Sequence, residues 1–284
     1  MVIALGVASR LEGEVSVAAR RPALDLAGSV PFVRDWIDLD GPLGPLLVGA
    51  VRGKLPEKLA SFARIVVLRA DPDGEAARSL GSLAPWVVTV ASARPGAEGS
   101  AHRRVAAVLS LDPDPPTSPW VTPVLPVPRG RAIVVHPGSG GRTKCWPASC
   151  FAEVSRLLTE GGVGPMVWVL GPAEIEAGMH APSGVEVLAA PPLARFVEHL
   201  AGASAYLGCD SGPSHLAAAV GTPCVLLFGP TNPSIWAPAA GWVRVIQGQA
   251  DHPDGHWGAA PRAVARAIEG LPARPCKAAR SVDG

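Results

Sequence analysis

Two loops of the chain carry residue types whose spacing is typical of anion binding. The first reads HPGSGGRTKCWP over residues 136–147 and combines three glycines, a hydroxyl and Lys144 ahead of a segment that begins with proline. Backbone N–H groups and an ammonium in such a loop bind anions. The loop is no P-loop, because no glycine directly precedes Lys144, and Thr143 breaks the G-x-G-x-x-G pattern. A glycine-rich turn with an incidental lysine therefore stays open as the alternative for this loop.

The second loop is more specific and reads DSGPSHLAAAVGTP over residues 210–223. A strand is predicted to end at Asp210, and Gly212 and Pro213 then suit the start of a helix. The N–H groups of the first turn stay open to an anion. His215 lies in that turn, where we expect it to contact a phosphate or a sugar. A buried structural histidine is the alternative.

The elements that must position these loops alternate between apolar β-type runs and helical stretches, which predicts an α/β fold with a mostly parallel sheet. Ligands bind beyond the carboxyl ends of the strands in such sheets. In the second half, strands are predicted at 132–136, 166–170, 205–208, 224–228 and 242–246, and helices at 147–158, 193–200, 213–220 and 261–268. In the first half, strands are predicted at 15–19, 36–39, 46–49, 65–69 and 87–90, and helices at 22–27, 56–63, 75–80 and 101–109.

A proline-rich segment separates the two halves. Residues 112–129 contain seven prolines, a composition that excludes a helix or a central strand and is typical of a stiff extended linker. We therefore predict an N-terminal domain over 1–111, a linker over 112–129 and a C-terminal domain over 130–284.

Composition excludes several function classes. The chain has 284 residues, of which 48% are hydrophobic, and a formal net charge of +1. It can therefore bury a core, and it has no basic excess with which to bind nucleic acid. Its five cysteines form no C-x-x-C pair, which argues against a disulfide framework or a zinc knuckle. A reducing, cytoplasmic compartment is predicted, and no apolar run is long enough to predict a membrane span.

Three motifs together carry a family resemblance. HPGSGG-x-x-K-x-WP, DSGPSHLAAA-x-GTP and LFGPT-x-P-x-x-W-x-P occur here in the order and spacing that resemble glycosyltransferase family 9, the ADP-heptose:lipopolysaccharide heptosyltransferases. The resemblance implies a GT-B fold of two Rossmann-like, doubly wound domains. It also implies inverting, metal-independent transfer of heptose or a similar sugar from a nucleotide-diphosphate donor to a lipid A-core or related glycan. No further cofactor is expected.

The resemblance also implies roles for single residues. Lys144 matches the lysine that binds the leaving diphosphate, and Glu174 matches, less securely, the acid that reaches the ribose. The other expected donor-binding residues lie in the two glycine-rich loops: His136, Ser139, Gly140, Asp210, Ser211, Gly212 and His215. DHPDGH at 251–256 could imitate a metal cluster but is typical of a solvated turn, so no metal site is predicted. Trp146 and Trp236 suit stacking on a base or sugar and core packing equally, and Cys145 and Cys209 are expected to be buried thiols.

The start of the chain departs from the family pattern. Family members begin with a strand and a loop ending in Gly-Asp, whose aspartate is the expected general base, and residues 1–13 carry neither. We therefore expect a first domain that lacks its first strand, and no general base is assigned. Either the natural start lies upstream, or the chain is an inactive nucleotide-sugar-binding remnant. A sugar epimerase of the same fold is a third alternative. The basic residues of the first half are scattered, which leaves a peripheral inner-membrane contact and an ordinary solvated surface both open.

Overall fold

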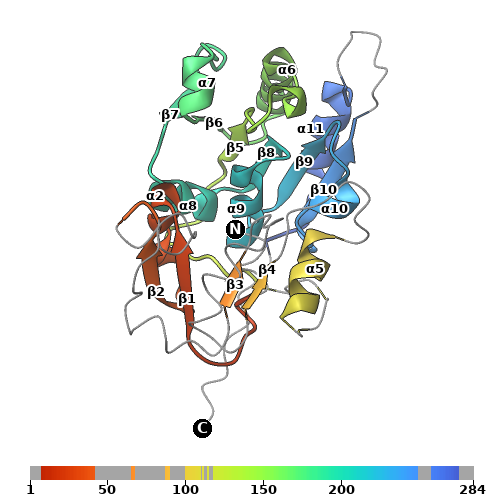
Figure 1. Ribbon diagram of the computed structural model, residues 1–284. Coiled ribbons are helices and arrows are strands. Elements are labelled where there is room, and N and C mark those ends of the chain that lie inside the picture. Colours follow the sequence, from red (N-terminus) through yellow and green to blue (C-terminus); the bar gives the residue numbers. More distant parts are fainter. Residues whose placement is uncertain are drawn as a thin grey trace. The chain divides into compact units, whose positions relative to one another are not determined.

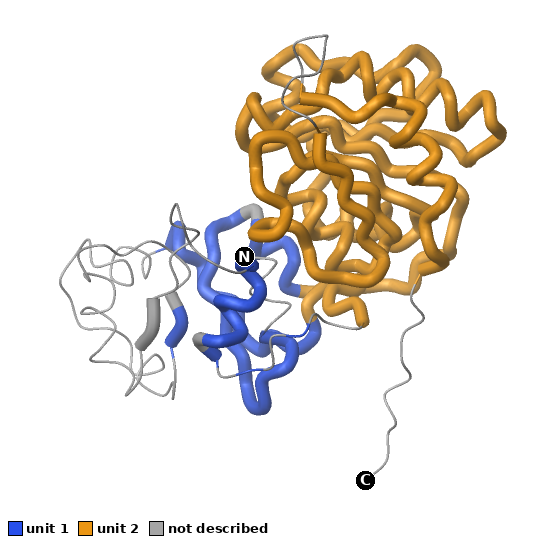
Figure 2. The backbone as a smooth tube through the Cα atoms, turned by 90° about the vertical axis from the view of Figure 1, so that its right-hand side faces the viewer, with its two compact units in different colours: residues 1, 3–27, 31–114 blue, residues 2, 28–30, 115–284 orange. Residues whose placement is uncertain are grey.

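The computed structural model describes residues 8–41, 65–67, 87–89, 100–109, 111, 114, 118–248 and 257–274. The elements predicted at 46–49, 56–63 and 75–80 lie outside these residues. The chain divides into two compact units (Figure 2). The N-terminal unit comprises residues 1, 3–27 and 31–114, and the C-terminal unit comprises residues 2, 28–30 and 115–284. Among the helices described, none is long and apolar enough to cross a membrane.

The described part of the N-terminal unit contains two parallel strand pairs. β1 (Val15–Ala19) pairs with β2 (Val33–Asp38), and β3 (Ile65–Val67) pairs with β4 (Val87–Thr89). β1 has the predicted bounds, whereas β2 begins earlier than predicted. The helix predicted at 22–27 is shorter: α2 (Arg21–Leu24) is followed by the 3₁₀ turn η1 (Ala27–Ser29). The helix α5 (Ala101–Val108) is confirmed, and the side chain of Ser100 caps it by accepting the N–H of Arg103.

The C-terminal unit is built on one parallel sheet of six strands in the order β10-β9-β8-β5-β6-β7 (Figure 1). Its strands are β5 (Ile133–His136), β6 (Met166–Leu170), β7 (Glu186–Ala189), β8 (Ala205–Cys209), β9 (Cys224–Phe228) and β10 (Val243–Gln247). β6 and β9 have the predicted bounds. β7 was not predicted, because this edge strand is short and mostly exposed and so lacks an apolar pattern.

Helices cover both faces of this sheet. Its central strands β5, β6, β8 and β9 are buried along their whole length, which explains their continuous apolar runs. α6 (Ala148–Glu160) and α11 (Pro261–Glu269) share one core cluster with alternate residues of these strands, and α8 (Leu193–Gly202) and α9 (Gly212–Val220) pack together on the other face. Two short helices, α7 (Pro172–Glu176) and α10 (Pro233–Trp236), were not predicted.

From residue 115 on, the proline-rich segment is part of the C-terminal unit. Its described residues form neither helix nor strand, as predicted. The backbone N–H groups of Trp120 and Val121 donate to Ala219 O near the end of α9, and Val121 is buried. The division between the units falls between residues 114 and 115, inside the predicted linker.

Candidate functional site

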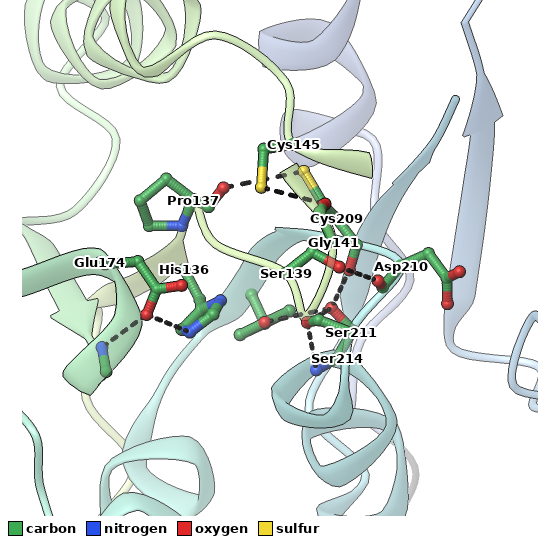
Figure 3. A network of polar contacts seen from close by, with 12 residues as sticks. His136, Pro137, Ser139, Gly141, Cys145, Glu174, Cys209, Asp210, Ser211 and Ser214 are labelled. Carbon is green, nitrogen blue, oxygen red and sulfur yellow. Dashed lines mark hydrogen bonds and ion pairs between the residues drawn. The ribbon is translucent and has the colours of Figure 1, made fainter. Parts of the chain in front are cut away.

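The carboxyl ends of the central strands bring the predicted residues to one edge of the sheet. His136 ends β5, Glu174 follows β6 after a tight turn, and Asp210 directly follows β8. Because β5 lies between β6 and β8, these residues come from three adjacent parallel strands. Figure 3 shows them around the glycine-rich loop that follows β5. The sheet topology thus assembles residues that are far apart in the sequence.

Lys144 and Asp210 form an ion pair at this edge. The distance between Lys144 Nζ and Asp210 Oδ2 is 2.9 Å. The Asp210 side chain is only 7% exposed, whereas that of Lys144 is 36% exposed. The hydroxyl of Ser139 donates to the backbone oxygen of Asp210 at 2.6 Å, which ties the two loops together (Figure 3). The pair therefore holds an ammonium in a defined place while leaving it accessible to a ligand.

The N-terminus of α9 lies beside this pair and is open. Ser211 is the N-cap residue, and its hydroxyl accepts the N–H of Ser214 at 3.4 Å. Pro213 has no N–H, and among the described residues the N–H of Gly212 has no partner. A Cβ atom at Gly212 or at Gly140 would meet no atom of the described residues within 4 Å, so both positions border open space in that part of the structure. The helix end presents partial positive charge to that space.

A buried hydroxyl network supports this helix end. Ser214 Oγ lies 3.1 Å from both Tyr206 Oη and Ser211 Oγ, and it donates to Cys209 O at 2.5 Å. Tyr206 is fully buried in β8. The network was not predicted, although a tyrosine in a strand eight residues before a serine in the first helical turn is a local signal for it.

His136, Glu174 and Gly138 form a second buried cluster. His136 Nε2 lies 3.8 Å from Glu174 Oε2, which also accepts the N–H of Gly171 at 2.8 Å (Figure 3). A Cβ atom at Gly138 would lie 2.6 Å from Glu174 Cγ and closer still to the carboxylate, so a larger residue there would force the Glu174 side chain to move. Burial lowers the pKa of His136, while the charge of Glu174 opposes this shift. Within the described part of the chain, buried His136 Nδ1 has no hydrogen-bond partner.

His215 is a neutral group at pH 7. Burial lowers the pKa of its imidazole to about 4, and the nearby charge of Asp210 opposes this shift only in part. Its backbone N–H donates to Ser211 O at 3.2 Å, within the first turn of α9. A neutral imidazole forms hydrogen bonds but adds no cation to an anion site.

The remaining candidates separate into core and surface. Trp146 is buried and packs edge-to-face on Phe151 with ring centroids 5.1 Å apart, so its interpretation as a stacking surface is wrong. Burial raises the pKa of Cys209 to about 12 and also raises that of Cys145, so both are protonated thiols.

Trp236 is partly buried in α10, and residues 251–256 lie outside the described chain. Within the described ranges, no group of three His, Cys, Asp or Glu residues is placed to hold a metal.

One residue near the site could not be identified from the sequence. The indole Nε1 of Trp257 donates to Thr143 O at 2.8 Å, directly before Lys144. Trp257 is separated from Lys144 by more than a hundred residues and lies in no predicted element.

Comparison with known proteins places this architecture in a family. Residues 115–254 match the model of glycosyltransferase family 9 (heptosyltransferase). Over this segment the C-terminal unit is similar to glycosyltransferase family 9. Lipopolysaccharide heptosyltransferase 1 of Pseudomonas aeruginosa is 36% identical over 109 residues, which are 37% of this chain and 31% of that protein. Lipopolysaccharide heptosyltransferase 3 of Escherichia coli is 34% identical over 118 residues, which are 37% of this chain and 33% of that protein. The matched segments thus span about a third of these family 9 relatives.

Solved structures extend the family 9 likeness over nearly the whole chain at the level of the fold. The E. coli ADP-heptose lipopolysaccharide heptosyltransferase II has a TM-score of 0.71 at 20% identity, covering 95% of this chain and 94% of that chain. The E. coli heptosyltransferase WaaC with ADP has a TM-score of 0.66 at 18% identity, covering 94% and 95%. The predicted α/β, GT-B fold class is confirmed. The expected loss of a first strand stays a prediction.

Proposed function

We propose that this chain is an inverting, metal-independent glycosyltransferase that moves heptose or a similar sugar from a nucleoside-diphosphate donor to a lipopolysaccharide-core or related envelope glycan. The family 9 match and the named heptosyltransferase relatives support the reaction class. The observation that carries the proposal is the accessible Lys144 ammonium, 2.9 Å from the buried carboxylate of Asp210 at the open start of α9.

In this reaction, the negative charge that the protein must stabilise develops beside Lys144 and the start of α9. The acceptor oxygen forms a bond to the anomeric carbon while the bond from that carbon to the diphosphate oxygen breaks, and the acceptor hydroxyl loses its proton to a base that is not assigned here. The departing diphosphate gains negative charge in the transition state. Lys144 and the Gly212 N–H offer positive charge that is already in place, which is the condition for effective electrostatic stabilisation. A cation and a helix end thereby take the role that a metal ion takes in other transferases.

The other predicted residues take supporting roles in this proposal. Ser139 uses its hydroxyl to hold the backbone of Asp210, so the loop's own phosphate contact comes from the backbone at Gly140. Glu174 accepts a ribose hydroxyl, and His136 lies against its carboxylate. Ser211 fixes the first turn of α9 as its cap, and the neutral His215 hydrogen-bonds a sugar hydroxyl or phosphate oxygen. The proposal includes a cytoplasmic location with a peripheral contact to the inner membrane, because the acceptor is lipid-linked.

The test is a transfer assay with a matched pair of variants. ADP-heptose and a heptose-deficient core acceptor are incubated with the chain, and mass spectrometry detects the addition of one heptose. Lys144→Ala should lower the rate by about 10²-fold, the typical effect of removing one preorganised charge-stabilising group. Arg142→Ala is the control, because Arg142 is an exposed cation in the same 3₁₀ turn, η3 (Arg142–Lys144).

Three outcomes separate the alternatives. Transfer that depends on Lys144 and not on Arg142 supports the proposal. Binding of ADP-heptose that is lost in Lys144→Ala, without any transfer, supports the inactive nucleotide-sugar-binding remnant instead. Conversion of the nucleotide sugar in the absence of acceptor would revive the epimerase.

A further inference from the structure

We infer that Trp257 is a positioning residue, which anchors the Lys144-bearing turn and thereby sets its affinity for a nucleoside diphosphate. The inference rests on the proposed donor site. Trp257 lies beyond residues 115–254, the segment that matches the family model. It is partly buried against the core cluster that α6 and α11 share with the sheet. Its role therefore follows from its own contacts.

The first contact is a hydrogen bond at the base of the lysine. Trp257 Nε1 donates to Thr143 O at 2.8 Å. The turn itself is the single 3₁₀ turn η3, closed by Lys144 N to Gly141 O at 2.9 Å and by Cys145 N to Arg142 O at 3.1 Å. Short 3₁₀ turns have poor hydrogen-bond geometry and are weak alone. An external donor to Thr143 O thus fixes the backbone from which the Lys144 side chain extends.

The second set of contacts packs the indole ring of Trp257 against Gly229 and Gly248, which we call the indole seat. Gly229 directly follows β9 and Gly248 directly follows β10. A Cβ atom at Gly229 would lie 2.6 Å from Trp257 Cγ, and one at Gly248 would lie 2.7 Å from Trp257 Cε3, distances that real Cβ atoms essentially never show. Neither glycine has a positive φ, so the backbone conformation does not require glycine there. What both positions require is room for the ring.

The sheet order explains how this seat reaches the site. β10 and β9 lie side by side, and β8 separates β9 from β5. Asp210 follows β8, and the Lys144 turn follows β5. Trp257 therefore links the ends of β9 and β10 to the loop after β5, past the strand that carries Asp210. The lysine is held twice: its backbone through Thr143 by Trp257, and its ammonium by Asp210.

Calorimetric titration of the full chain with ADP tests this inference. Trp257→Phe keeps a ring in the seat and removes the N–H, and ADP binding should weaken about 5-fold, as for the loss of one neutral hydrogen bond. Trp168→Phe is the matched control, because Trp168 is a buried tryptophan of β6 whose Nε1 donates to Ser155 Oγ at 3.1 Å, within the core. It should change ADP affinity by less than about 2-fold.

A double-mutant cycle identifies the route of the effect. Because Trp257 acts through Lys144, Trp257→Phe should add nothing to the loss caused by Lys144→Ala. Gly229→Ala is an independent perturbation that displaces the ring without changing Trp257. It should weaken ADP binding in the natural chain and should have no effect when combined with Trp257→Ala.

The outcomes separate this inference from the proposed function. If Lys144→Ala weakens ADP binding but Trp257→Phe does not, the inference is overturned and the proposed donor site stands. An equal loss from Trp257→Phe with and without Lys144 also overturns it, because the ring then acts elsewhere. If the natural chain binds no ADP, the donor site itself is refuted, and this inference with it.

Discussion

Replacing Gly138 with alanine tests the buried cluster that holds Glu174. The new Cβ would lie 2.6 Å from Glu174 Cγ and closer still to the carboxylate. The side chain must therefore move, and it loses the hydrogen bond from Gly171 N–H, which is 2.8 Å long. A hydrogen bond to a charged group contributes about 1.5 to 3 kcal/mol. We expect the free energy of unfolding of the C-terminal unit to fall by about 2 to 3 kcal/mol.

Native-state hydrogen exchange in β8 provides the assay, because the slowest amides of a buried central strand report the global opening of their unit. Gly140→Ala is the control: it makes the same change in the same loop, where a Cβ meets no atom within 4 Å, and it should be neutral or stabilising by up to about 1 kcal/mol. In a Glu174→Ala background, Gly138→Ala should cost almost nothing. Equal costs at Gly138 and Gly140, or an unchanged cost without Glu174, would refute the reasoning.

Two further predictions concern the start of α9. The pKa of His215 is about 4 in the fold and about 6.5 when unfolded, so the unfolded chain binds a proton that the fold excludes, and stability is lost as the pH falls from 7 towards 4. The loss should reach about 2 to 3 kcal/mol in urea titrations at several pH values, and His215→Asn should remove this part of the slope; an unchanged slope would contradict the assignment. Ser214→Ala removes the hydroxyl 3.1 Å from buried Tyr206 Oη and should cost about 1 to 3 kcal/mol in the same titrations. Adding Tyr206→Phe should recover the part of this cost that comes from the unpaired tyrosine hydroxyl, whereas the bond to Cys209 O stays lost. A cost that Tyr206→Phe leaves unchanged would exclude the hydroxyl pair as its cause.

The fold of the C-terminal unit could be predicted in large part because its strands are buried on both faces. β6 and β9 are continuous apolar runs, and their predicted bounds are those observed. β7 escaped prediction because an edge strand with exposed residues has no such run. α7 and α10 have only five and four residues, too few to show helical periodicity.

Some residues of the site could likewise be predicted from the sequence, and others could not. Lys144 and Asp210 could be placed together in advance, because each follows a predicted parallel strand and such strands end at one edge of the sheet. The fit between Gly138 and Glu174 could not, since it depends on atomic distances between loops of different strands. The same holds for Trp257, whose partner Thr143 is distant in the sequence and whose seat is two glycines that no local pattern distinguishes.

The central claim is that Lys144 and the start of α9 bind the diphosphate of a nucleotide donor, and affinities for ADP and adenosine test it most directly. Lys144→Ala should weaken ADP binding by about 10- to 100-fold, the equivalent of one charge-assisted contact, and should leave adenosine binding unchanged. An equal loss for both ligands, or no loss for ADP, would contradict the account.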